Sequence, residues 1–203
     1  GYIYVHDMSA RRDTMNCCLF DVKNVLSGGF EMGNIWYNEP KTLDVAFDVI
    51  GDIVLSAASQ QYGGFTVPSV DLILEPYAEK SYKKYVDKYL RLAIDKDTAE
   101  AEAYADVVRD FEQGFQGWEY KFNTVASSRG DYPFITVTAG TGTGRFAKQA
   151  TISMLNVRRR GQGKKECKKP VLFPKIVFLY DENLHGPGKP LEDVFEAGVQ
   201  CSA

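Results

Sequence analysis

The sequence predicts an α/β fold in which most strands run parallel. Short apolar runs, rich in β-branched and aromatic residues, alternate along the chain with longer segments whose apolar residues recur every three or four positions. The chain has 203 residues, 44% of them hydrophobic, which suffices for one sizeable core and is near the usual size of one domain. Strands that alternate with helices are typical of parallel sheets covered by helices.

Four segments have the composition of strands. The second contains two adjacent cysteines, and the fourth is so apolar that we expect it to be buried on both faces, as strands of parallel sheets are. These segments are residues 2–5, 15–20, 132–138 and 171–179.

The helices are predicted from apolar spacing and from their boundary residues. Pro40 opens the first, and the pattern ends at a glycine pair. The Lys-, Glu- and Ala-rich middle of the chain has the composition of solvated helices, with a break at Asp95. The predicted helices are residues 40–62, one that begins at Ser69, one or two within 77–115, 146–157 and 190–203.

Charge and cysteine usage exclude several protein classes. A net charge of −3 favours no particular partner, and four cysteines, two of them adjacent, do not resemble the disulfide framework of a small secreted protein. No apolar run approaches the roughly 20 residues that cross a bilayer, and the first residues read as a strand rather than an export signal. We therefore expect a cytoplasmic protein, and the missing initial methionine suggests that sequence upstream is absent.

The pair Cys17-Cys18 follows Asn16 at the start of an apolar run. Side chains alternate faces along a strand, so one cysteine can point into an interior while the other packs behind it. A free cysteine is also simply a small buried apolar residue. The pair alone leaves both interpretations open.

A glycine-rich segment, residues 138–145, lies between a predicted strand and a predicted helix. Backbone N–H groups bind phosphate at such positions. The spacing is Gly-x-Gly-x-Gly and not the Gly-x-Gly-x-x-Gly of dinucleotide sites, although the arginines at 158–160 stand about where a 2′-phosphate contact would. A nicotinamide-dinucleotide-binding oxidoreductase domain that uses residues 140–145 therefore remains an alternative.

Residues 158–169 contain seven basic residues and one acidic residue, Glu166. Such runs usually form a solvated loop, and a nucleic-acid-binding patch is the functional alternative. No aromatic residue interrupts the run, which argues against nucleic acid. The aromatic cluster Phe111, Phe115, Trp118, Tyr120 and Phe122 is expected to form core or subunit interface.

Taken in order, the motifs resemble the catalytic domain of the anaerobic (class III) ribonucleoside-triphosphate reductases, which are glycyl radical enzymes. After Cys17 the matching segments are residues 29–34, 39–42, 59–64, 123–130, 133–134, 140–143 and 173–178. The resemblance covers nearly the whole chain and implies a ten-stranded α/β barrel, of which residues 1–203 form the N-terminal part.

The resemblance also implies the site. Cys17 is the expected catalytic cysteine beside the substrate, with Cys18 behind it, and Asn16 and His6 are expected to bind the substrate. His6 beside Asp7 also fits a satisfied histidine at a turn. Gly63, Gly64, Gly140 and Thr141 are expected substrate contacts, although a glycine pair after a helix is most often a C-cap.

Further components are implied outside this chain. They are the radical cysteine, the glycyl radical, a four-cysteine zinc site, a formate or thiol-protein reductant, and a separate activase with an iron–sulfur cluster and S-adenosylmethionine. Ribonucleoside triphosphates are the implied substrates, nucleotides the effectors, and a homodimer the assembly, with residues 40–62 as a candidate interface. The chain itself shows no metal-ligand spacing, and no membrane or nucleic-acid partner is expected.

Overall fold

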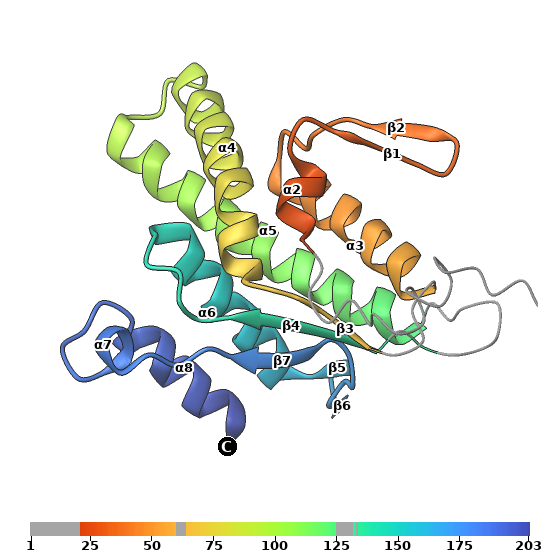
Figure 1. Ribbon diagram of the computed structural model, residues 1–203. Coiled ribbons are helices and arrows are strands. Elements are labelled where there is room, and N and C mark those ends of the chain that lie inside the picture. The colour runs from red at the N-terminus through yellow and green to blue at the C-terminus, as the bar shows by residue number, and fades with distance from the viewer. Residues whose placement is uncertain (1–20, 60–63, 125–131, 133) are drawn as a thin grey trace, which may run out of the picture.

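The computed structural model describes residues 21–59, 64–124, 132 and 134–203 (Figure 1). Helices and strands alternate along much of this part of the chain, which confirms a mixed α/β fold. The elements are α2 (Val22–Leu26), β1 (Phe30–Met32), β2 (Ile35–Tyr37), α3 (Leu43–Ser59), β3 (Phe65–Val67), α4 (Val70–Arg91), α5 (Lys96–Thr124), β4 (Ile135–Ala139), α6 (Arg145–Arg160), β5 (Gln162–Lys164), β6 (Cys167–Lys169), β7 (Lys175–Phe178), α7 (Glu182–His185) and α8 (Glu192–Ser202).

A three-stranded parallel sheet, in the order β3-β4-β7, lies at the centre of the described fold. Val67, Val137 and Ile176 are neighbours in its register and face a core that the helices build. Because side chains alternate along each strand, the residues between them face the opposite side of the sheet. The helices therefore bury one face of the sheet.

The long helices α4 and α5 lie side by side and are joined by a short turn (Figure 1). The break falls where the sequence predicted it, because Asp95 caps α5: its Oδ1 accepts the N–H of Thr98 at 3.0 Å. This bond to the Thr98 N–H holds the pKa of Asp95 below its usual value. α4 also packs on α6, α5 packs on α3 and α6, and α8 packs on α6.

The predicted aromatic cluster forms the contact between α3 and α5. The ring of Phe47 lies 4.9 Å from those of Phe115 and Trp118, and the indole N–H of Trp118 donates to the carbonyl oxygen of Phe47 at 2.8 Å. Phe111 and Phe122 are buried as well, whereas Tyr120 is exposed. The core interpretation is confirmed for four of the five residues.

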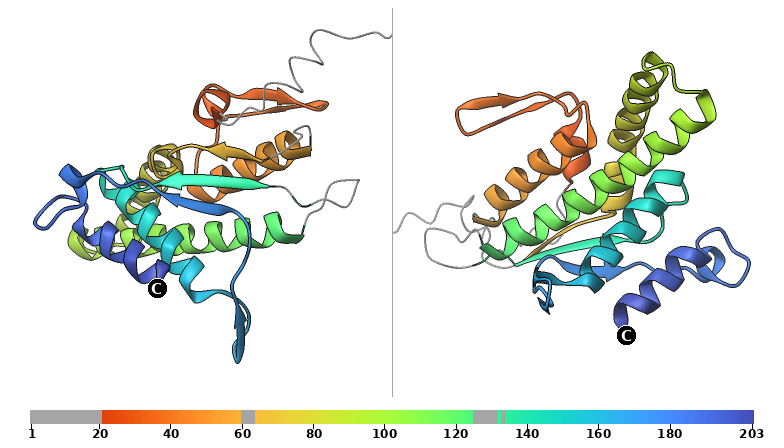
Figure 2. Two further views of the ribbon diagram at one scale, coloured as in Figure 1. Left: turned by 60° about the horizontal axis from the view of Figure 1, so that its bottom comes forward. Right: turned by 180° about the vertical axis from the view of Figure 1, so that it is seen from behind.

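Residues 158–160 end α6. Residues 163–169 are exposed, as expected for a solvated run, but they belong to the antiparallel hairpin β5–β6, which projects from the body (Figure 2), and not to an irregular loop. Buried Gln162 anchors it, because its Nε2 donates to Glu119 Oε2 at 2.5 Å. Glu119 also accepts from Arg158 Nε at 2.7 Å, so a buried polar network fixes the base of the hairpin.

The apolar run at 171–179 is the second correction. Its strand, β7, is limited to Lys175–Phe178, and Val177 is 45% exposed, so the expectation of burial on both faces is wrong for the described fold. Only the side of β7 that carries Ile176, which is continuous with the core-facing side of β4, is covered by helices. The predicted strands at 2–5 and 15–20 lie outside the described residues.

Candidate functional site

The face of the sheet turned away from the helices carries polar side chains. Thr66, Thr136 and Lys175 stand in one row across the three strands, and Thr138 is paired with Val177 in the next. All five side chains are half-buried or exposed. We call this surface the open face.

The glycine loop, residues 140–144, leaves the carboxyl end of central strand β4 and leads into α6. In open parallel sheets, ligands bind outside the carboxyl ends of the strands, so the loop and the open face together form the candidate site. Gly140 has φ +131°, a conformation that favours glycine. A Cβ there would lie 2.8 Å from the carbonyl oxygen of Leu179.

Asp71, in the first turn of α4, occupies two of the loop's amides. Its Oδ2 accepts the N–H of Gly140 at 3.2 Å and that of Gly142 at 3.0 Å. The side chain is fully buried, and its Oδ1 accepts no hydrogen bond from the residues that the structure describes. A carboxylate thus takes the place that a phosphate occupies in a nucleotide-binding loop.

Close packing around the loop restricts its glycine positions to different degrees. A Cβ on Gly142 would lie 2.5 Å from the Cβ of Ala147 and 2.9 Å from Asp71 Oδ2. A Cβ on Gly144 would clash with the carboxylate of Glu75. Gly140 is therefore required by its backbone conformation and by Leu179, and Gly142 by the packing of Ala147 and Asp71, whereas the flexible Glu75 side chain can move away from a Cβ on Gly144.

His185, at the end of α7, contacts the loop from the other side. Its Nε2 lies 2.7 Å from the carbonyl oxygen of Gly140, and its Nδ1 lies 3.0 Å from the backbone nitrogen of Asp181. A carbonyl oxygen can only accept, so Nε2 donates to Gly140, while Nδ1 lies 3.0 Å from the carbonyl oxygen of Asp181 as well. The ring is buried and stacks on Tyr180.

Arg145 begins α6 next to the loop. Its guanidinium lies 4.5 Å from the ring centres of both Tyr82 and Tyr104. A cation at a helix N-terminus is disfavoured by the helix dipole, and the two aromatic faces offset this by cation–π attraction. Burial raises the pKa of Tyr104, whose hydroxyl donates to Gln149 Oε1 at 2.8 Å.

Of the residues predicted for the site, the structure describes three. Gly140 and Thr141 lie in the glycine loop, and Thr141 is half-buried. Gly64 precedes β3, and a Cβ there would lie 2.8 Å from the carbonyl oxygen of Phe134. Gly64 therefore permits this close approach of the two chain segments.

The other four predicted residues, Cys17, Asn16, His6 and Gly63, lie outside the described residues, as does Cys18. Their placement is not tested by the structure. Asp71 and His185, by contrast, were not predicted. Neither residue lies in a recognisable sequence motif, because the role of each depends on hydrogen-bond partners far away in the sequence.

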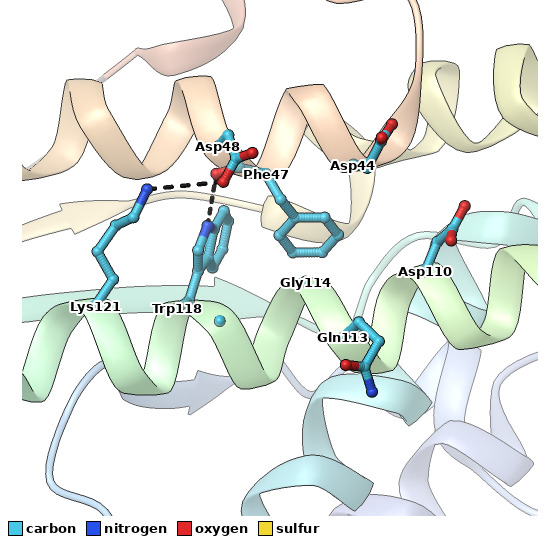
Figure 3. Close-up of a pocket in the computed structure, with 9 residues that line it drawn as sticks. Asp44, Phe47, Asp48, Asp110, Gln113, Gly114, Trp118 and Lys121 are labelled. Atoms are coloured by element: carbon cyan, nitrogen blue, oxygen red, sulfur yellow. Dashed lines mark hydrogen bonds and ion pairs between the residues drawn. The ribbon is translucent and has the colours of Figure 1, made fainter.

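A second concave region lies between α3 and α5, with a volume of about 220 Å³ (Figure 3). Asp44 and Asp110 line one end of this groove. At the other end Lys121 pairs with Asp52 at 3.3 Å and with Asp48 at 3.8 Å. Burial raises the pKa of Asp110, although Tyr85 donates a hydrogen bond to it at 2.8 Å.

Two features are absent from the part of the chain that the structure covers. It contains no group of three or more His, Cys, Asp or Glu side chains placed to hold a metal ion. Among its described helices, none is long and apolar enough to cross a membrane.

The fold and the candidate site define the class as an α/β domain that presents a polar face and a glycine loop at the carboxyl ends of parallel strands. A sequence model of the family "Anaerobic ribonucleoside-triphosphate reductase" matches residues 1–203. The chain belongs to the anaerobic ribonucleoside-triphosphate reductase family.

Individual relatives agree with this assignment. The chain is 35% identical over 209 residues to the anaerobic ribonucleoside-triphosphate reductase of Enterobacteria phage T4, and 33% identical over 208 residues to that of Escherichia coli K12. The whole chain aligns in both cases, but it spans only 33% and 28% of those proteins.

A solved structure shows a similar fold. The crystal structure of the anaerobic ribonucleotide reductase from Thermotoga maritima, in complex with dATP and CTP, superposes with a TM-score of 0.58 at 16% identity. The match covers 98% of this chain and 33% of that chain.

Proposed function

We propose that this chain forms part of the catalytic α/β barrel of an anaerobic ribonucleoside-triphosphate reductase and supplies one wall of its active site. The observation that carries the proposal is the family match over residues 1–203. The open face supports the proposal. A parallel sheet covered by helices on one face and polar on the other fits a barrel wall whose polar face lines the interior, where the ligand binds, and whose edges pair with further strands.

In this proposal the substrate is a ribonucleoside triphosphate held against the open face and the glycine loop. Thr141, Gly63 and Gly64 contact it, together with Asn16 and His6, and Gly140, whose N–H is bonded to Asp71 and whose carbonyl oxygen is bonded to His185, holds Thr141 in place. Cys17 presents its thiol to the ribose and supplies a proton to the 2′-hydroxyl, which leaves as water, while the electron pair for the reduction comes from the external reductant. The radical chemistry that abstracts the ribose 3′-hydrogen is supplied from outside this chain.

The remaining components are proposed on the same basis. The reductant is formate or a thiol protein, nucleotides act as effectors, and a separate activase with an iron–sulfur cluster and S-adenosylmethionine generates the glycyl radical. The complete enzyme is a cytoplasmic homodimer, with α3 as a candidate interface. The zinc site lies outside this chain.

The nicotinamide alternative receives no support. The amides of Gly140 and Gly142 are bonded to Asp71. The three arginines that would meet a 2′-phosphate have other partners: Arg158 donates to Glu119, Arg159 donates to Gln200, and Arg160 pairs with Glu112. The family assignment also speaks against it.

The test is a pair of substitutions in the complete enzyme, activated anaerobically. Cys17→Ala should abolish deoxyribonucleotide formation while the glycyl radical signal in electron paramagnetic resonance persists, because the thiol acts after radical formation. Cys18→Ala is the matched control and should retain turnover. Turnover in Cys17→Ala, or its loss only in Cys18→Ala, would reverse the assignment.

A further inference from the structure

Gly140 is bound on both sides by buried polar side chains from two different helices. Asp71 of α4, fully buried, accepts its N–H, and His185 of α7, 1% exposed, donates to its carbonyl oxygen. The same carboxylate oxygen holds Gly142. One residue of the loop is thus fixed through both of its backbone polar groups.

Burying these two side chains is unfavourable unless they form specific bonds. A buried carboxylate loses its hydration, and here one of its two oxygens accepts no bond from the described residues. An apolar residue would fill the same volume without that penalty. What Asp71 and His185 provide instead is directional bonds to one backbone segment.

These bonds determine the orientation of the peptide groups that flank Gly140. Thr141 follows at once, so its direction at the carboxyl end of β4 depends on them. A third bond links the same region to the open face, because the N–H of Ser69, just before α4, donates to Thr138 Oγ1 at 2.8 Å. The first turn of α4 thereby aligns both Thr138 and the loop.

We propose that Asp71 and His185 are positioning residues for the substrate-facing loop. Neither touches the substrate. Together they hold Gly140 so that Thr141 is presented at the carboxyl end of the sheet. The inference rests on the proposed function, because it requires the glycine loop to contact the substrate.

The chemistry of each side chain defines a conservative and a disruptive substitution. Asp71→Asn keeps an acceptor oxygen for both amides, whereas Asp71→Ala removes it. His185→Gln keeps an amide N–H that can donate to Gly140, whereas His185→Phe keeps an aromatic ring and loses the donor. If His185 only fills space, His185→Phe should keep more substrate affinity than His185→Gln. If His185 positions the loop, His185→Gln should keep more.

The experiment measures KM and kcat for a ribonucleoside triphosphate in the complete, activated enzyme, and hydrogen exchange of peptides that contain residues 138–145. His185→Phe loses one buried hydrogen bond and should raise KM about tenfold, and Asp71→Ala loses two and should raise it at least as much. Both variants should speed exchange in the loop. Asp71→Asn and His185→Gln should restore most of the affinity. The glycyl radical content should be similar in all variants.

Ser81→Ala is the matched control. Ser81 is buried on the same helix as Asp71, and its hydroxyl accepts the N–H of Leu43 at 2.8 Å, away from the loop. This variant also loses a buried side-chain acceptor of a backbone N–H, so it should lower stability without raising KM.

The outcomes separate the inference from the proposed function. If the unchanged enzyme turns over and Asp71→Ala and His185→Phe keep its KM, the positioning role is wrong. It is also wrong if the conservative and disruptive variants lose substrate affinity equally. Absence of turnover in the unchanged enzyme would instead refute the proposed function, and the inference with it.

Discussion

At the scale of single residues, the protein uses carboxylates in two opposite ways. Asp95 is exposed and accepts N–H bonds at a helix start, which lowers its pKa. Asp110 is partly buried in the groove between α3 and α5 and near Asp44, and burial raises its pKa. The direction of each shift determines how that group contributes to stability as pH changes.

We expect opposite pH profiles for Asp110→Asn and Asp95→Asn in the complete protein. The folded-state pKa of Asp110 is raised, so its contribution to the stability of the fold is most favourable below pH 3.8 and declines as pH rises through the folded-state pKa. Asp110→Asn keeps an acceptor for Tyr85 and should raise the melting temperature at pH 7, with the gain vanishing near pH 3.8.

The folded-state pKa of Asp95 is lowered, so its contribution to the stability of the fold is present above pH 3.8 and is lost as pH falls through the folded-state pKa. Asp95→Asn should therefore lower the melting temperature at pH 7 and approach the wild type in acid. Thermal unfolding across pH measures both variants. The same sign of change for both at pH 7 would contradict the argument.

At the scale of elements, the contact between α3 and α5 depends on one glycine. Phe47 packs directly on the backbone of Gly114, where a Cβ would overlap its ring, whereas a Cβ on Gly117 would meet nothing within 4 Å. The two glycines lie on the same helix and both line the groove, so they differ mainly in this contact.

Gly114→Ala should therefore destabilise this contact by about 1–3 kcal/mol, because the Phe47 ring must leave its position. Gly117→Ala should stabilise α5 by up to about 1 kcal/mol, because alanine is the better helix former. Hydrogen exchange of α3 and α5 peptides in the complete protein measures both changes. A stabilising Gly114→Ala would show that Phe47 has another position of equal energy.

The sequence predicted the long helices and the strands β4 and β7, and missed the three-residue strands, for physical reasons. The helix start at Ser69 and the break at Asp95 were correct because apolar spacing is a local signal and Asp95 caps α5, whereas Ser69 makes no side-chain cap. The strands of β5–β6 were missed because they are three residues long, polar and anchored by Gln162, a tertiary contact. β3 is equally short and is defined by pairing with β4.

The candidate site was predictable only in part. The glycine loop was found from its spacing, but the contacts that require Gly140 and Gly142 come partly from Leu179 and Asp71, which lie far from the loop in the sequence. His185 likewise reaches Gly140 only in the folded chain. Such contacts leave no periodic signal.

At the scale of the whole molecule, the described sheet has exposed surfaces. β3 and β7 are its outer strands within the described residues, and the open face exposes Val177. Near α8, Tyr180 and Val199 are 56% and 50% exposed. Uncovered strand edges and apolar patches favour association.

We therefore expect the isolated 203-residue chain to be inactive and to self-associate. It should bind a dye specific for exposed apolar surface, form oligomers in light scattering, and produce no deoxyribonucleotide with activase and formate. Co-expression with the rest of a reductase barrel should suppress the dye binding. A monomer with a cooperative thermal transition and no dye binding would show that residues 1–203 form a self-sufficient domain.

The order of the sheet also has a kinetic consequence. β3 and β4 are adjacent and parallel, yet the entire α4–α5 hairpin separates them in the chain. Closing so long a loop is entropically costly unless the intervening segment is already compact. α4 and α5 contact each other through residues close in sequence, and their antiparallel packing brings the end of α5 back near the start of α4, beside β3. Folding of the helical hairpin should therefore precede strand pairing, so that the turn at residues 92–95 limits how fast the sheet assembles.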